Sequence, residues 1–162
     1  MFSRIIAAIL AFFIWLFPSL QKPQPLNAET VANNLMWAVE TKDINLFEKQ
    51  LCLNIKQNVE DLPSKITGLF DAIDGDLVGF TWRTMGGYFE RDGSGKSISQ
   101  NILIIDFTTS AGSYRIMGTL EYHNSFKPEE MGIRAITLFD PPTATTGVVD
   151  IRATEGVGDW HN

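Results

Sequence analysis

The chain is poor in the residues that build most metal and redox sites. Its 162 residues include one cysteine, Cys52, and two histidines, His123 and His161. A single cysteine excludes an intrachain disulfide and a cysteine-rich metal site, so the fold must depend on its hydrophobic core. We therefore expect neither a metal nor a cofactor.

Clusters of positive charge are also missing. Thirteen Lys and Arg stand against 19 Asp and Glu, which gives a formal net charge of -6. Proteins that bind nucleic acid neutralise phosphates with clustered basic side chains, so this class of partner is excluded.

Recognisable catalytic motifs are absent as well. The segment from Gly93 to Ser97 ends in Gly-Lys-Ser, but Glu90 occupies the place of the first glycine of a phosphate-binding loop. A strand pattern rather than a helix pattern follows it, so this segment is interpreted as a hairpin turn. No serine has the G-x-S-x-G setting of a hydrolase nucleophile.

An apolar run dominates the N-terminus. Thirteen apolar residues extend from Ile5 to Phe17, after one early positive charge at Arg4. This length is typical of a secretory signal and is shorter than the about 20 residues of a membrane-spanning helix. Residues 1–28 are therefore predicted to be a signal peptide or a short membrane anchor with a spacer. The protein is expected to be exported, and either secreted or attached to the membrane only by this segment.

The remaining length suits one globular domain. We assign it to residues 29–140, followed by a C-terminal tail over residues 141–162. The tail is rich in Thr and Gly and is expected to be partly mobile, with one possible edge strand from about Val148 to Arg152.

Three helix patterns open the domain. Asn27 and Asp43 are predicted to cap the first two helices, and Asp61 with Pro63 opens the third. Residues 51–57 fit either a helix or a short strand, and the helix is favoured. The third helix is predicted to end at Gly75 and to bury one apolar face, made of Ile66, Leu69, Phe70 and Ile73.

Strand patterns follow the helices. Gly86-Gly87 is predicted to form a bulge within the first strand, and Asp92 to Gly95 is predicted to form a hairpin turn. A helical layer folding onto an antiparallel sheet gives the class α+β. The four expected strands are Leu77 to Arg91, Ser97 to Thr109, Ser113 to His123 and Gly132 to Phe139.

Three segments together carry a family resemblance: ETKDINLFEKQLC, LFDAIDGDLVGF and EEMGIRAITLFD. Over about Glu29 to Asp140 the chain resembles domain-of-unknown-function family 5104, a bacterial family of exported domains. Such domains look like members of the nuclear transport factor two-like, or cystatin-like, superfamily. The resemblance implies N-terminal helices packed in the concave face of a curved, four- to five-stranded antiparallel sheet, a cone shape. Many members look like lipoproteins with a cysteine at the end of the signal, and this chain has none there.

Five residues are candidates for a site at the open end of such a cone. Asp106 follows the apolar residues Ile104 and Ile105, where burial would raise its pKa toward that of a general base. Arg134 could pair with an acidic side chain or with a ligand carboxylate. The remaining candidates, Trp82, Tyr88 and Tyr114, are possible pocket-lining residues, although Trp82, Tyr88 and Phe89 are expected mainly to pack in the core.

Two classes of function remain open. The preferred hypothesis is a non-catalytic domain that binds a small ligand or an envelope protein. The alternative is an isomerase- or dehydratase-type enzyme that uses Asp106 as its base in a sheet-lined pocket. Self-association to a homodimer through the sheet is a further possibility.

Overall fold

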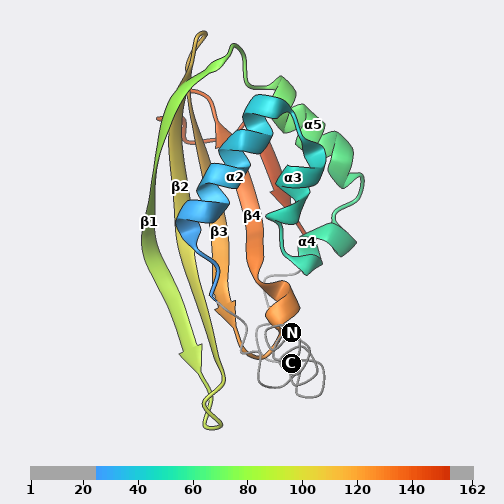
Figure 1. Cartoon of the computed structure of the whole chain (residues 1–162), viewed down its shortest axis with the longest axis vertical. Helices are drawn as coiled ribbons and strands as arrows, with labels where there is room; N and C mark the ends of the chain where they lie inside the picture. Colours follow the sequence, from blue (N-terminus) through green and yellow to red (C-terminus); the bar gives the residue numbers. More distant parts are fainter. Residues whose placement is uncertain (1–24, 154–162) are drawn as a thin grey trace, which may run out of the picture.

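Within residues 25–153, which the computed structural model describes, four α-helices precede a five-stranded antiparallel sheet. The predicted α+β class is confirmed. Figure 1 shows the helices gathered on the concave side of a curved sheet. The predicted signal or anchor in residues 1–24 and the end of the tail, residues 154–162, lie outside the described residues.

The first two helices begin at the predicted caps. In α2, Ala28–Thr41, the side chain of Asn27 accepts a hydrogen bond from the backbone N–H of Glu29 (2.9 Å). In α3, Ile44–Lys49, the Asp43 carboxylate accepts one from the N–H of Leu46 (3.0 Å). Both bonds satisfy N–H groups that a helix start leaves without an intrahelical partner.

Two further helices, α4 (Leu53–Asn58) and α5 (Leu62–Asp71), follow where one separate helix was expected. The helical interpretation is confirmed for residues 53–57, whereas Leu51 forms an isolated bridge with Ile133. The segment is a helix of its own, which makes four helices rather than three. The Glu130 carboxylate accepts a hydrogen bond from the N–H of Asn54 (3.1 Å) and so caps α4. This contact joins residues far apart in the chain, which is why local periodicity did not reveal it.

The sheet is a simple meander in the order β1-β2-β3-β4-β5. Every neighbouring pair is antiparallel, and a short 3-10 helix, Pro128–Glu130, precedes β4. β5 extends the sheet into the segment after residue 140. The strands are β1 Leu77–Arg91, β2 Ser97–Thr109, β3 Ser113–Asn124, β4 Gly132–Phe139 and β5 Val149–Arg152.

The predicted glycine turns are present, but α5 ends at Asp71, four residues before the predicted stop at Gly75, so Gly75 belongs to the turn that leads into β1. Gly75 has φ +79°, and a Cβ there would lie 2.5 Å from Ser110 Oγ, so no other residue fits without displacement. The register of β1 against β2 shifts between Met85 and Tyr88, which places the predicted bulge at Gly86-Gly87. Gly86 has φ +60°.

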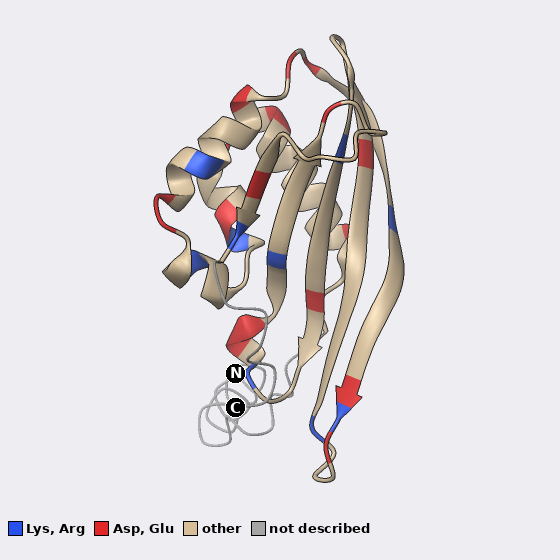
Figure 2. Ribbon diagram, turned by 180° about the vertical axis from the view of Figure 1, so that it is seen from behind, with Lys and Arg blue, Asp and Glu red and all other residues tan. Residues whose placement is uncertain are grey.

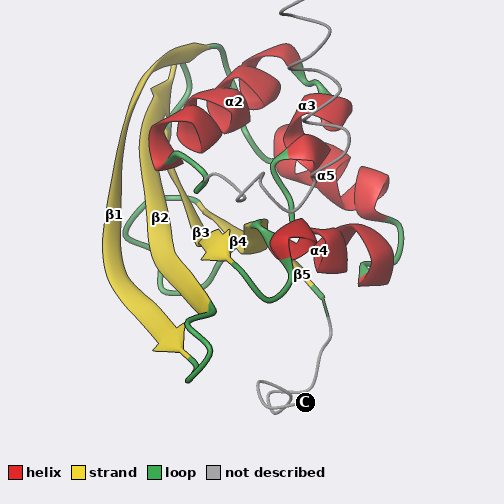
Figure 3. Ribbon diagram, turned by 60° about the horizontal axis from the view of Figure 1, so that its bottom comes forward, coloured by secondary structure: helices red, strands yellow, loops and turns green. Residues whose placement is uncertain are grey.

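The core lies between the helices and the concave face of the sheet (Figure 3). Ile66, Phe70 and Ile73 of α5 and the turn after it are buried as predicted, and the Phe70 ring meets the Phe47 ring edge to face at 5.5 Å. The sheet contributes Leu103, Ile105, Phe107, Tyr114, Ile116, Leu120, Ile133, Ile136, Leu138 and Ile151.

β1 departs from the predicted core role. Trp82, Tyr88 and Phe89 are 37%, 45% and 66% exposed, so the expectation that they pack in the core is wrong. β1 is the edge strand, and Figure 1 shows the β1–β2 hairpin extending past the helical layer. Among residues 25–153, β1 has a neighbouring strand on one side only, and no helix covers its far half.

No helix among residues 25–153 has the length and apolar content needed to cross a bilayer.

Truncation of Phe70 tests the packing of the helices. Phe70→Ala removes a buried ring that contacts Phe47, and we expect it to lower the free energy of unfolding by about 3–5 kcal/mol. Trp37→Ala, at a 60% exposed position of α2, is the matched control and should change it by less than about 1 kcal/mol. Urea titration followed by circular dichroism measures both, and equal losses would contradict this packing.

Candidate functional site

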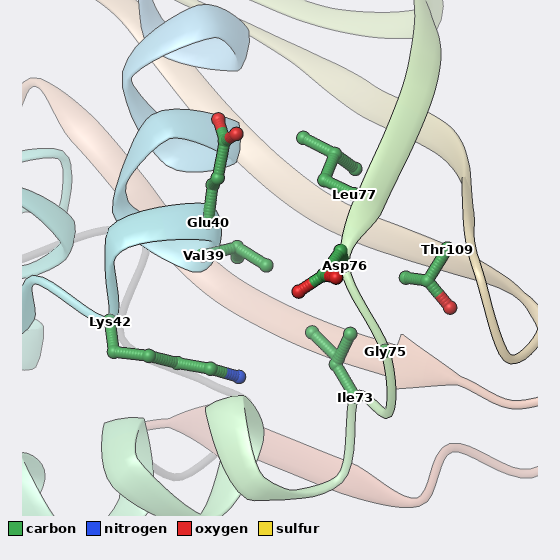
Figure 4. A pocket seen from close by; sticks show the side chains of 8 residues that line it. All are labelled: Val39, Glu40, Lys42, Ile73, Gly75, Asp76, Leu77 and Thr109. Carbon is green, nitrogen blue, oxygen red and sulfur yellow. The ribbon is translucent and has the colours of Figure 1, made fainter.

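One pocket lies where α2 ends beside the start of β1. Its volume is about 240 Å³, and its lining comes from Val39, Glu40, Lys42, Ile73, Gly75, Asp76, Leu77 and Thr109. Figure 4 shows side chains from the end of α2 and from the α5–β1 connection pointing into the space between them. Pockets that hold drug-sized ligands are commonly about 300–1,000 Å³, so this one is small.

Two polar side chains of the pocket already have structural partners. Lys42 Nζ donates to the carbonyl of Phe70 (2.5 Å) and lies 5.7 Å from the centre of its ring. Thr109 Oγ1 donates to the carbonyl of Asp74 (2.5 Å) and accepts from the N–H groups of Ala111 and Gly112. These side chains satisfy the backbone of the α5–β1 and β2–β3 connections.

None of the five predicted site residues lines this pocket. Glu40, Lys42, Asp76 and Thr109 were therefore missed as pocket residues. They come from three separate places in the chain and no spacing rule joins them, so the sequence carries no signal for the pocket.

Asp106 lies on the convex face of the sheet. Its neighbours in the strand, Ile105 and Phe107, belong to the core, and successive strand residues point to opposite faces. Tyr114 and Trp82 are paired in register with Phe107 and Ile105, so they share the concave face. The structure therefore does not bring Asp106 together with Tyr114 and Trp82 in one pocket.

Two arginines hold the Asp106 carboxylate. Arg83 Nη1 and Arg115 Nε each lie 2.6 Å from one of its oxygens. The hydrogen bond from Arg115 is the largest effect on the pKa of Asp106 and lowers it. Burial opposes this, but the hydrogen bond from Arg83 and the charges of both arginines lower the pKa further, so it lies below its ordinary value. The prediction of a raised pKa is wrong, because Asp106 faces two cations rather than the apolar core.

Tyr114 and Arg134 are built into the fold at separate places. The Tyr114 hydroxyl, buried beside Phe107, accepts a hydrogen bond from the N–H of Asp74 (3.1 Å). Arg134 Nη1 lies 2.9 Å from Oε2 of Glu121, so the predicted ion pair with an acidic residue is present.

Glu121 is the centre of a buried polar cluster. Its side chain is 0% exposed, and Arg134, Gln100 and Asn124 all donate to it, the last two at 2.7 and 2.6 Å. Burial lowers the pKa of the Arg134 guanidinium, but the hydrogen bond and charge of Glu121, together with the nearby Cys52 and Glu130, outweigh burial, so the pKa is raised overall. A buried carboxylate that accepts hydrogen bonds from three side chains serves the structure of the domain.

Metal and thiol chemistry have no site among residues 25–153. No group of three or more His, Cys, Asp and Glu side chains there is placed to hold a metal ion. Burial raises the pKa of the Cys52 thiol, so Cys52 packs in the core as a small apolar side chain.

The largest group of exposed apolar side chains follows β1. We call this group the β1 surface; it consists of Val78, Trp82, Met85, Tyr88 and Phe89, with Ile102 of β2 beside Met85. Met85 and Phe89, 52% and 66% exposed, were not among the predicted site residues. The sequence did carry a signal for this exposed surface. Strands joined by consecutive hairpins place the first strand at the edge of the sheet, and an edge strand has a neighbouring strand on one side only.

The β1 surface includes both faces of one strand. Trp82 is paired with buried Ile105 and belongs to the concave face, whereas Met85 is paired with Ile102 on the convex face. Figure 2 shows charged residues spaced out along the strands of the sheet, with long uncharged stretches between them. Both Trp82 and Tyr88, two of the predicted ligand-binding residues, lie on this surface.

The pKa of Asp106 generates a pH prediction. A lowered native pKa means that its ion pairs stabilise the fold above the unfolded pKa, near 3.9, and that this contribution disappears as pH falls through the native value. Asp106→Asn should therefore lose less stability than the wild type between pH 7 and pH 2.5.

Urea midpoints across this pH range measure the effect. Asp150→Asn, which breaks the exposed pair with Arg152, is the control and should follow the wild type. Parallel curves for the wild type and Asp106→Asn would contradict the assignment.

Comparison with known proteins gives a family and no activity. The family model described as "Domain of unknown function (DUF5104)" matches residues 34–143, which span β1 to β4 and most of the helical layer. No curated protein matches the chain. The match covers more than half of the chain, and the chain therefore belongs to the DUF5104 family.

Proposed function

We propose that this domain is a non-catalytic binding module of an exported protein, and that it binds another polypeptide along the open edge of β1. The observation that carries the proposal is the β1 surface, in which large apolar side chains line a 15-residue edge strand. Such a strand is a ready template for pairing with a further strand.

The two edges of the sheet differ in a way that supports this proposal. Natural edge strands are commonly shortened, charged or interrupted by proline to prevent unwanted pairing. β5 follows this rule, with four residues that include Asp150 and Arg152. β1 is long and contains no proline, and its apolar side chains outnumber its charged ones, Arg83, Glu90 and Arg91.

A polypeptide partner fits better than a small ligand. The pocket beside α2 is small, and its Lys42 and Thr109 side chains are used by the backbone around it. An exposed strand edge instead offers a row of backbone donors and acceptors, and apolar side chains on both faces add contact area.

The enzyme alternative has weaker support. An isomerase or dehydratase base needs a proton affinity near the working pH, whereas Arg83 and Arg115 lower the pKa of Asp106. Its carboxylate also faces away from the concave side, where Trp82 and Tyr114 lie.

Site-specific photocrosslinking in the producing cells tests the proposal. A photoreactive phenylalanine analogue replaces Phe89 of β1, and in a matched control it replaces Trp37, which is similarly exposed on α2. We expect a discrete covalent adduct with a polypeptide at position 89, at least fivefold more abundant than any at position 37. Equal yields at both positions, or no adduct at 89, would contradict the proposal.

A further inference from the structure

We propose that the polypeptide bound at β1 is a second copy of this chain, and that the two β1 strands pair antiparallel about a two-fold axis between Gly86 and Gly87. The inference rests on the proposed function, because it names the partner of the same surface. Three properties of β1 support it. They are the direction of its backbone groups, the way its bulge makes residues on either side point to the same face, and the side chains that the pairing would bring together.

The backbone groups at the open edge can be assigned from the hairpin. The N–H of Asp92 donates to the carbonyl of Lys96, and the N–H of Ser110 donates to the carbonyl of Asp76, both at 2.9 Å. Even-numbered residues of β2 therefore direct their backbone groups toward β1, because such groups alternate in direction along a strand. From Phe80 onward, the β1 residues paired with odd-numbered β2 residues therefore direct their backbone groups to the open edge. They are Phe80, Trp82, Thr84, Phe89 and Arg91.

The bulge gives β1 an unusual internal symmetry. Met85 and Tyr88 are paired with Ile102 and Gln100, which share one face of β2, so Met85 and Tyr88 both point to the convex side. Thr84 and Phe89 point to the concave side by the same argument. Residues equally distant from the Gly86–Gly87 peptide therefore share a face and a backbone direction, which antiparallel pairing of two identical strands about that point requires.

The pairing brings complementary side chains together. Arg83 of each copy lies opposite Glu90 of the other, which creates two ion pairs across the axis. Within each copy Arg83 also pairs with Asp106, and Glu90 accepts a hydrogen bond from the Tyr88 hydroxyl, so the new ion pairs extend these contacts. Trp82 lies opposite Arg91, an arrangement that favours a cation–π contact, and Met85 lies opposite Tyr88, which favours a sulfur–aromatic contact. Each of these contacts occurs twice, and only glycines lie at the axis.

Other registers lose this match. A shift by one residue sets side chains of opposite faces against each other. A shift by two residues moves the two bulges apart, so that each bulge faces a regular part of the other strand, and in one direction it sets Arg83 opposite Tyr88. The side chains and the bulge thus favour the same register.

Disulfide mapping with the full chain tests the register. We expect an equimolar mixture of Met85→Cys and Tyr88→Cys to form a covalent dimer in oxidised glutathione, at least fivefold more than either variant alone. Both positions are exposed, and the buried Cys52 is common to all samples. A mixture of Arg83→Cys and Tyr88→Cys reports the register shifted by two residues and should not exceed the single variants. Preferential crosslinking of this control mixture would overturn the proposal.

A backbone variant tests the dimer without new cysteines. Thr84→Pro removes an N–H that faces the open edge and leaves the bonds between β1 and β2 in place, whereas Thr84→Val keeps it. Light scattering should give twice the monomer mass for the wild type and Thr84→Val. Thr84→Pro should weaken association at least tenfold with little change in circular dichroism.

The two proposals fail separately in these experiments. A wild-type protein that stays monomeric at all concentrations, with no Met85–Tyr88 crosslink, overturns the homodimer. The proposed function survives that result if position 89 still crosslinks to a different protein in cells. Both the homodimer and the proposed function fail if position 89 gives no adduct at all.

Discussion

How far the helical layer extends over the sheet determines which parts of the sheet remain exposed. The helices place their apolar residues on the concave face, where Ile105, Phe107, Ile116 and Leu138 complete the core. β1 lies at the margin of that layer, and its hairpin with β2 extends past it. The same packing that stabilises the fold therefore leaves a long apolar strand open along one side.

Several charged groups, Arg83 of β1 among them, hold the fold together. Asp106 joins β1 and β3 through Arg83 and Arg115, and Glu121 joins β2 and β4 through Gln100 and Arg134. Lys42 anchors the end of α2 to α5. These groups are already paired within the domain, and this supports the proposed binding function.

Much of the fold could be predicted from local patterns. Strand alternation located β1, β2 and β4 to the residue. Gly75 and Gly86-Gly87 marked the turn before β1 and the bulge because positive φ favours glycine, although α5 itself ends earlier, at Asp71. The site was harder to predict. Alternation of Phe80 and Trp82 indicates a strand but not what covers it, and the pairing of Asp106 with Arg115 follows from a register that local periodicity does not supply.

Amide hydrogen exchange by NMR tests most directly whether the open edge of β1 is a binding surface. The amides of Trp82, Thr84, Phe89 and Arg91 face the open edge, whereas those of Met85 and Tyr88 face β2. The account predicts that the first group exchanges fast in dilute protein and becomes protected as protein concentration rises, while the second group is protected throughout. Exchange of the first group that stays fast at every concentration would contradict it.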